Sequence, residues 1–162
     1  MAKTITINKA IKVSEELRSR GKTIVLVGGC FDIIHSGHIH FLENAKAQGD
    51  VLFVMLESDQ HIKQLKGQER PINTQRDRAL ILEALLAVDY IILLPPFKSN
   101  KEYDLLVFTL KPAIIATTKG DPGKMHKERQ AHHLEDTRVI DVIDSVQYKS
   151  TSCLLDNYIK AL

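Results

Sequence analysis

The sequence has few cysteines and no long hydrophobic run, and each of these features excludes a class of protein. Its only cysteines, Cys30 and Cys153, lie far apart and lack the paired spacing of a zinc site. Two thiols do not make a disulfide framework, so both are expected to be reduced. No apolar run reaches the length of a membrane span, and the first residues hold no signal-peptide core. We therefore expect a cytoplasmic protein with no membrane partner.

The sequence also has little net charge. Its 22 lysines and arginines exceed its 20 acidic residues by only +2, which does not indicate a nucleic-acid partner. The 162 residues, 44% of them hydrophobic and 26% charged, are ordinary for a soluble globular chain and enough to bury a core. We expect one domain over residues 1–162, in which any positive field is local.

Apolar, β-branched runs recur along the chain, with helical patterns between them. Runs that are apolar throughout suit parallel strands buried on both faces. They occupy 23–27, 51–56, 90–94, 113–117 and, more weakly, 138–143. The alternation predicts a single Rossmann-like α/β domain with a doubly wound, five-stranded parallel sheet. The charged segment 66–73 and the basic segment 118–130 are predicted loops, and the chain is predicted to end in an amphipathic helix.

The turn after the first of these runs reads "GGCFDIIHSGH" and lies where such sheets bind ligands. Gly28 and Gly29 allow a tight turn, and a helix that begins near His35 would point its amides at the same spot, as phosphate sites require. His35 and His38 would share one face of that helix. The turn lacks the G-x-G-x-x-G pattern of dinucleotide sites, and no third ligand stands at a convincing spacing for zinc, so we predict no protein-bound metal. A metal site and a purely structural role for the histidines remain alternatives.

This turn resembles the first motif of the cytidylyltransferase-like nucleotidyltransferases, G-x-F-D-x-x-H-x-G-H. The six fixed positions of that motif all match, at Gly29, Phe31, Asp32, His35, Gly37 and His38. The family shares its nucleotide-binding core with the class I aminoacyl-tRNA synthetases. The resemblance implies transfer of a nucleoside monophosphate to a phosphorylated acceptor, with release of pyrophosphate.

Further matches extend the resemblance over nearly the whole chain. Lys66 takes the place of the family's lysine before a mobile loop, and Arg78 that of the arginine opening the next helix. "TKGDP" matches the glycine–aspartate segment, and "YKSTSCLL" matches I-S-T-[ST], with Lys149 replacing an apolar residue. No arginine precedes this last motif, unlike in glycerol-3-phosphate cytidylyltransferases. "LKGQERPIN" is most similar to the domain that adenylylates D-glycero-β-D-manno-heptose 1-phosphate.

The resemblance implies a role for each matched residue. Implied catalytic residues are His35, His38, Lys66 and Arg78. Implied nucleotide-binding residues are Gly29, Cys30, Phe31, Asp32, His35, Ser36, Gly37, His38, Gly120, Asp121, Ser150, Thr151 and Ser152, and the implied acceptor-binding residues are Lys63 and Arg70. Arg78 is expected to be an exposed cation that contributes little to folding.

The resemblance also implies substrates and partners. These are ATP or CTP, Mg²⁺ carried mainly by the triphosphate, a small phosphorylated acceptor and a second copy of the chain in a homodimer. Three alternatives stay open: a glycerol-3-phosphate or other cytidylyltransferase, a nucleotide-binding module without catalysis, and structural roles for the charged residues. In the last case Lys66 and Arg70 would be a solvated loop, Arg78 a surface salt bridge, and the serines and threonine at 150–152 a helix cap.

Overall fold

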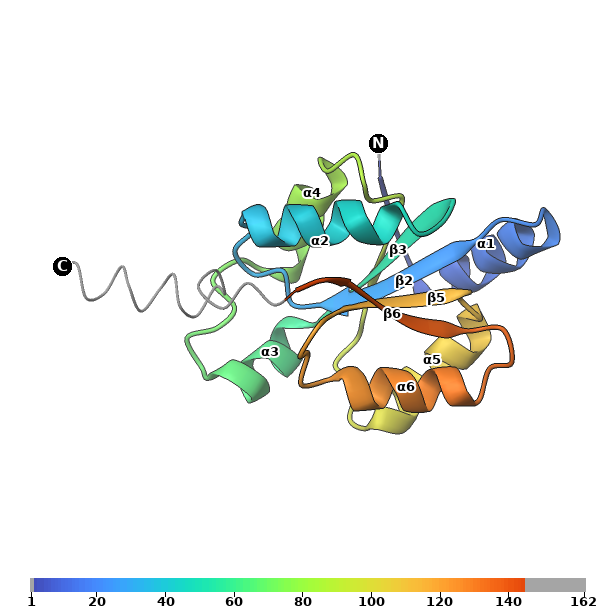
Figure 1. Ribbon diagram of the computed structural model, residues 1–162. Coiled ribbons are helices and arrows are strands. Elements are labelled where there is room, and N and C mark those ends of the chain that lie inside the picture. The colour runs from blue at the N-terminus through green and yellow to red at the C-terminus, as the bar shows by residue number, and fades with distance from the viewer. Residues whose placement is uncertain (1, 145–162) are drawn as a thin grey trace.

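A computed structural model describes residues 2–144, which fold around one parallel sheet (Figure 1). Its six strands lie in the order β1-β4-β3-β2-β5-β6, and every neighbouring pair is parallel. The strands are β1 (Lys3–Ile5), β2 (Ile24–Gly29), β3 (Val51–Leu56), β4 (Tyr90–Leu93), β5 (Ile114–Thr118) and β6 (Arg138–Ile143). All five predicted strands are confirmed. The predicted total of five is wrong, because β1 adds a short strand at the edge beside β4.

Helices cover both faces of the sheet (Figure 1). They are α1 (Ile7–Ser19), α2 (Ser36–Lys46), α3 (Asp59–Lys66), α4 (Gln75–Glu83), α5 (Asn100–Leu110) and α6 (Lys124–His132). The helices α2 and α4 pack on one face, and α1, α5 and α6 pack on the other. The predicted loop at 118–130 is corrected in its second half, because α6 begins at Lys124. The helix predicted at the C-terminus lies outside the described residues.

The sequence marks most helix starts with a capping residue. Thr6, Ser58 and Thr74 each accept a hydrogen bond from a backbone N–H three residues later, and Ser99 and Glu102 form a capping box. These caps satisfy amides that would otherwise lack partners. The helix α2 differs, because its N-cap residue His35 makes no side-chain cap hydrogen bond. The backbone amides in the first turn of α2, which faces the end of β2, are therefore not capped by the side chain of His35.

The centre of the sheet is the core. Residues 24–27 of β2 and 52–56 of β3 are buried, as their uninterrupted apolar runs predict. The chain runs from β2 outward to β3 and β4 on one side, and β5 and β6 lie on the other side of β2. Ligands bind open α/β sheets at this kind of switch point, beyond the carboxyl ends of the strands. Within residues 2–144, no helix is long and apolar enough to cross a membrane.

Candidate active site

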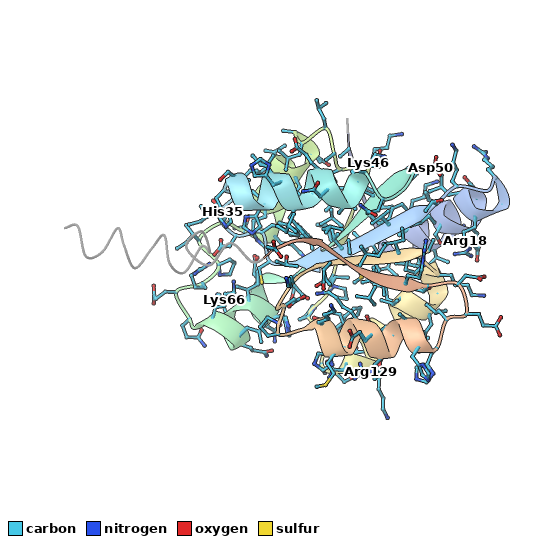
Figure 2. The ribbon with its side chains drawn as sticks, in the orientation of Figure 1. Arg18, His35, Lys46, Asp50, Lys66 and Arg129 are labelled. Atoms are coloured by element: carbon cyan, nitrogen blue, oxygen red, sulfur yellow. The ribbon has the colours of Figure 1, made fainter. Side chains whose placement is uncertain are left out.

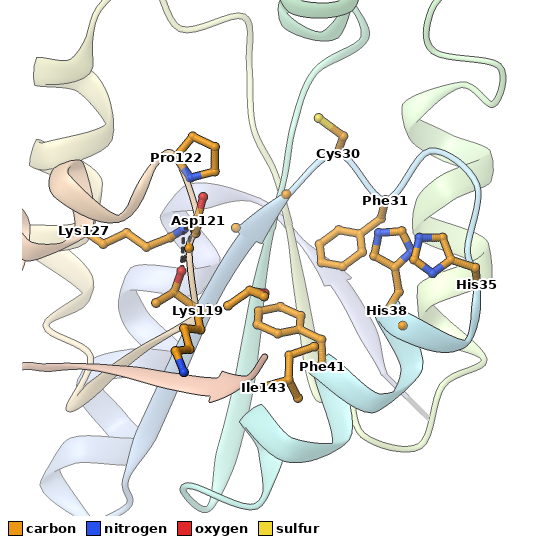
Figure 3. A pocket seen from close by; sticks show the side chains of 16 residues that line it. Cys30, Phe31, His35, His38, Phe41, Lys119, Asp121, Pro122, Lys127 and Ile143 are labelled. Atoms are coloured by element: carbon orange, nitrogen blue, oxygen red, sulfur yellow. Dashed lines mark hydrogen bonds and ion pairs between the residues drawn. The ribbon is translucent and has the colours of Figure 1, made fainter. Parts of the chain in front are cut away.

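A pocket of about 380 Å³ opens at the switch point, between the carboxyl ends of β2 and β5 (Figure 3). The turn after β2 and the first turn of α2 form one wall, and the segment after β5 forms the other. Its lining includes eight of the predicted site residues: Gly29, Cys30, Phe31, His35, Gly37, His38, Gly120 and Asp121. The fold therefore brings together two motifs that are more than eighty residues apart in sequence.

Two histidine rings stack on each other in this pocket. The ring centroids of His35 and His38 are 3.9 Å apart, with an angle of 32° between the ring planes (Figure 3). Gly37 makes this arrangement possible, because a Cβ at that position would lie 3.0 Å from two atoms of the His35 ring. The glycine of the H-x-G-H pattern is thus explained by packing. Both imidazoles are directed to the place where the pocket meets the start of α2.

His38 is neutral near pH 7. Burial, together with the charges of His35 and Lys66, lowers the pKa of His38 from 6.5 to about 4. Its Nδ1 is buried and has no hydrogen-bond partner among the described residues. A neutral imidazole has one N–H donor and one acceptor nitrogen. The neutral ring can therefore donate one N–H hydrogen bond to a phosphate oxygen.

The backbone turn that carries these residues is tight at Phe31. Phe31 is buried and has a φ of 46°, in the left-handed region that non-glycine residues rarely adopt. Its ring lies over Gly29, where an added Cβ would be 2.9 Å from Cε2. Glycine at that position lets the aromatic ring close the floor of the pocket.

Asp32 and Arg70 lie beneath the turn as a buried ion pair. Asp32 is 1% exposed and Arg70 8%, and the Arg70 Nε donates to Asp32 Oδ2 at 2.6 Å. The other carboxylate oxygen accepts from the backbone N–H groups of Ile72 and Asn73 at 2.8 and 3.1 Å. Burial alone would raise the pKa of Asp32, but these hydrogen bonds hold it below its ordinary value. The pair fastens the 67–73 loop to the turn, and neither residue is among those lining the pocket.

Arg78 is fully buried, with 0% of its surface exposed, so the expectation of an exposed cation is wrong. Its guanidinium donates to the carbonyl oxygens of Cys30, Asn73 (3.1 Å) and Glu57 (2.7 Å). It also donates to Asp59 Oδ1 at 2.7 Å. Only an arginine fork matches acceptors spread over three loops in this way. The contacts place Arg78 behind the wall of the site, where it holds the ends of β2 and β3.

A second polar cluster lies after β5. The Asp121 carboxylate accepts hydrogen bonds from Thr117 Oγ1 at 2.6 Å, from the N–H of Gly123 at 2.8 Å and from the ammonium of Lys127 (Figure 3). Burial would raise the pKa of Asp121, but these donors lower it below its usual range. Asp121 is therefore ionised and fixed, and Lys127 is held at the rim of the pocket.

The remaining predicted residues lie around the pocket. Lys66 is exposed at the end of α3, and its charge lowers the pKa values of His38 and Cys30, although burial keeps the pKa of Cys30 above its ordinary value. Figure 2 labels His35 and Lys66 at the same end of the molecule. Ser36 and Lys63 are exposed and are not among the lining residues. The predicted residues Ser150, Thr151 and Ser152, with Lys149, lie outside the described residues.

The pocket also contains side chains to which the sequence analysis assigned no role. Thr118, Lys119 and Pro122 belong to the matched segment "TKGDP", and the others are Phe41, Thr117, Lys127 and Ile143. Phe41 lies three residues after His38, so a projection of α2 onto one face would have found it. Lys127 belongs to the basic segment after β5, but its contact with Asp121 depends on α6, which was not predicted to begin there.

Comparison with known proteins agrees with this geometry. The family model for Cytidylyltransferase-like proteins matches residues 26–151, which include the histidine turn and the segment after β5. The chain belongs to the cytidylyltransferase-like family. The family predicted from the histidine turn is thus confirmed, and with it the class of nucleotidyltransferase enzymes.

Relatives with curated names add detail. The bifunctional protein HldE of a Nitratiruptor species is 40% identical over 144 residues, which is 89% of this chain and 29% of that protein. HldE of Campylobacter fetus subsp. fetus is 40% identical over 150 residues, or 91% of this chain and 31% of that protein. The chain thus spans under a third of the length of these two relatives.

Solved structures share the fold. The lipopolysaccharide core biosynthesis protein from Thermoplasma volcanium has a TM-score of 0.60 and 27% identity, covering 80% of this chain and all of that one. Pantoate-beta-alanine ligase from Francisella tularensis has a TM-score of 0.66 and 17% identity, covering 100% of this chain and 79% of that one. At that identity the second likeness concerns the fold alone, and it supports the Rossmann-like architecture.

Proposed function

We propose that this protein transfers AMP from ATP to a sugar 1-phosphate of the heptose type, D-glycero-β-D-manno-heptose 1-phosphate, and releases pyrophosphate. The observation that carries the proposal is the stacked pair of His35 and His38 at the start of α2, in one pocket with Gly29 and Asp121. The relatives named bifunctional protein HldE support the proposal by their 40% identity over most of this chain. The loop "LKGQERPIN" supports the heptose acceptor by its likeness to the domain that adenylylates heptose 1-phosphate.

The reaction needs no protein nucleophile. Near neutral pH the acceptor phosphate is mostly a dianion, because its second pKa is about 6. One of its oxygens forms a bond to the α-phosphorus of ATP, the bond from that phosphorus to the bridging oxygen breaks, and pyrophosphate leaves with the electron pair. The difficulty is to bring two anions together and to stabilise the charge that develops.

The residues of the pocket suit that task. His35 and His38 would donate to the phosphates around the reacting centre, and the amides at the start of α2 would add fixed dipoles. Lys66 would attract the β- and γ-phosphates, and Asp121 would orient the nucleoside. Mg²⁺ would be bound by phosphate oxygens and water. Among residues 2–144, no group of three His, Cys, Asp or Glu side chains is placed to ligate a metal.

Pyrophosphate release with ATP or CTP, and with heptose 1-phosphate or glycerol 3-phosphate, tests the proposal. We expect the highest kcat/KM for ATP with heptose 1-phosphate, and we expect His38→Ala to lower kcat by about a hundredfold or more. Preference for CTP with glycerol 3-phosphate would replace adenylyl transfer by cytidylyl transfer. Nucleotide binding without turnover of any acceptor would favour a non-catalytic module. A His38→Ala protein that folds and turns over at the parental rate would remove the histidine from the mechanism.

The proposal includes a homodimer, on the family resemblance, and the cytoplasmic location expected from the sequence. Sedimentation velocity of the purified chain tests the dimer, and fractionation of the source cells tests the location.

A further inference from the structure

A second cavity, of about 580 Å³, lies beside the first pocket. It opens on the face of the sheet that α5 and α6 cover. Residues at or just after the end of β2 and on α6, among them Gly29, Cys30 and Lys127, line both cavities. The two cavities therefore meet at the place where the reacting phosphate would lie. A ligand in the second cavity could present one end to a nucleotide in the first.

A carboxylate and a phenol form the polar wall of this second cavity. Glu57 follows β3, and the hydroxyl group of Tyr103 from α5 donates to its Oε2 at 2.9 Å. Burial raises the pKa of Glu57, against the opposing effect of this hydrogen bond. Burial and the neighbouring carboxylate also raise the pKa of Tyr103. Neither group lines the first pocket, and the proposed transfer reaction gives neither a role there. Their position beside the junction of the two cavities therefore needs another explanation.

More groups that can hydrogen-bond surround this pair. The ring of His61 lies 5.9 Å from that of Tyr103, and its Nδ1 is buried with no hydrogen-bond partner among the described residues. Leu65, Met55 and other aliphatic side chains form the rest of the wall. Polar groups beside an apolar surface suit a polyhydroxylated carbon chain, which offers hydroxyl groups on one side and C–H groups on the other.

We propose that this cavity is the acceptor pocket, which binds the carbon skeleton of a polyhydroxylated sugar phosphate, and that Glu57 accepts hydrogen bonds from its hydroxyl groups. The inference rests on the proposed function, because it takes the nucleotide to occupy the first pocket. The acceptor phosphate would lie at the junction near Lys127, and the hydroxyl groups would reach Glu57 and Tyr103.

The test measures KM separately for the two substrates. In Glu57→Gln and in Tyr103→Phe we expect KM for heptose 1-phosphate to rise about tenfold or more, while KM for ATP changes by less than about twofold. Glu128→Gln is the matched control, because this exposed carboxylate on α6 lines neither cavity. It should leave both KM values unchanged. Thermal melts of all four proteins show whether each variant folds.

Several outcomes overturn the inference. A rise in KM for ATP alone would assign the cavity to the nucleotide, and unchanged KM values in both folded variants would remove it from substrate binding. If the wild-type protein prefers another acceptor, the proposed function fails and the same variants are measured with that acceptor. If it turns over no acceptor, calorimetry with heptose 1-phosphate and a non-hydrolysable ATP analogue decides. Binding that Glu57→Gln weakens supports the acceptor pocket, and absence of binding refutes it.

Discussion

Replacing Arg78 with alanine should destabilise the fold strongly, although the residue is a cation in a proposed polyphosphate site. Its guanidinium makes four hydrogen bonds, three of them to backbone carbonyls, and none of its surface is exposed. A hydrogen bond that involves a charged group contributes about 1.5–3 kcal/mol. The four do not simply add, because the Asp59 side chain is 38% exposed and water can replace its partner. We expect a loss of about 3–5 kcal/mol in the free energy of unfolding.

Urea unfolding near neutral pH, followed by circular dichroism, measures this loss. With a slope of about 2 kcal/mol per molar urea, the midpoint of Arg78→Ala should fall by roughly 2 M. Arg78→Lys should recover less than half of the loss, since one ammonium cannot reach carbonyls on three loops. A folded Arg78→Ala protein within about 1 kcal/mol of wild type would refute the structural role. If such a protein also lost ATP turnover, the contact with polyphosphate implied by the resemblance would be favoured instead.

Three further predictions concern the pocket itself. The free energy of unfolding should fall by about 2 kcal/mol between pH 7 and pH 5. In the unfolded chain the His38 imidazole takes up a proton below pH 6.5, whereas in the folded protein it does so only near pH 4. In paired urea titrations, His38→Asn should remove this part of the pH dependence. Lys66→Ala should raise the pKa of His38 in an NMR titration and raise KM for ATP about tenfold, with an unchanged melting temperature. Gly29→Ala should cost about 1–3 kcal/mol of stability, because the new Cβ would meet the Phe31 ring at 2.9 Å, and a neutral result would mean that the ring moves freely.

The sequence predicted the parts of the fold that depend on burial. Each run that is apolar throughout became a strand of the sheet, because only a position covered on both faces makes such a run favourable. The strand β1 escaped prediction because three residues at a sheet edge carry little apolar signal. The helix α6 began inside a predicted loop because its N-cap is Gly123 and its residues show almost no amphipathic pattern.

The sequence placed the glycines and histidines of the candidate pocket together, but it did not show that the arginines are buried. Spacing alone places His35 and His38 on one face of a helix turn, and the structure stacks them there. Residue spacing does not show which cationic side chains are exposed. Polar or charged residues directly precede both Arg70 and Arg78 in the sequence, yet each arginine is buried by acceptors from distant segments. Those acceptors are a carboxylate and carbonyl groups that become neighbours only after the sheet has formed.

At the carboxyl edge of the sheet, the arginines that stabilise the fold contact the backbone of the segments that form the candidate site. Arg78 donates to the carbonyl of Cys30, which lines both cavities, and to the carbonyl of Glu57, which lines the second. The Asp32–Arg70 pair fastens the loop beyond α3 to the same turn. The residues that would touch substrate are thus imidazoles, lysines, carboxylates and a phenol, and the arginines hold the backbone that carries them. A loss of turnover in an arginine variant must therefore be compared with its loss of folding free energy before any contact with phosphate is inferred.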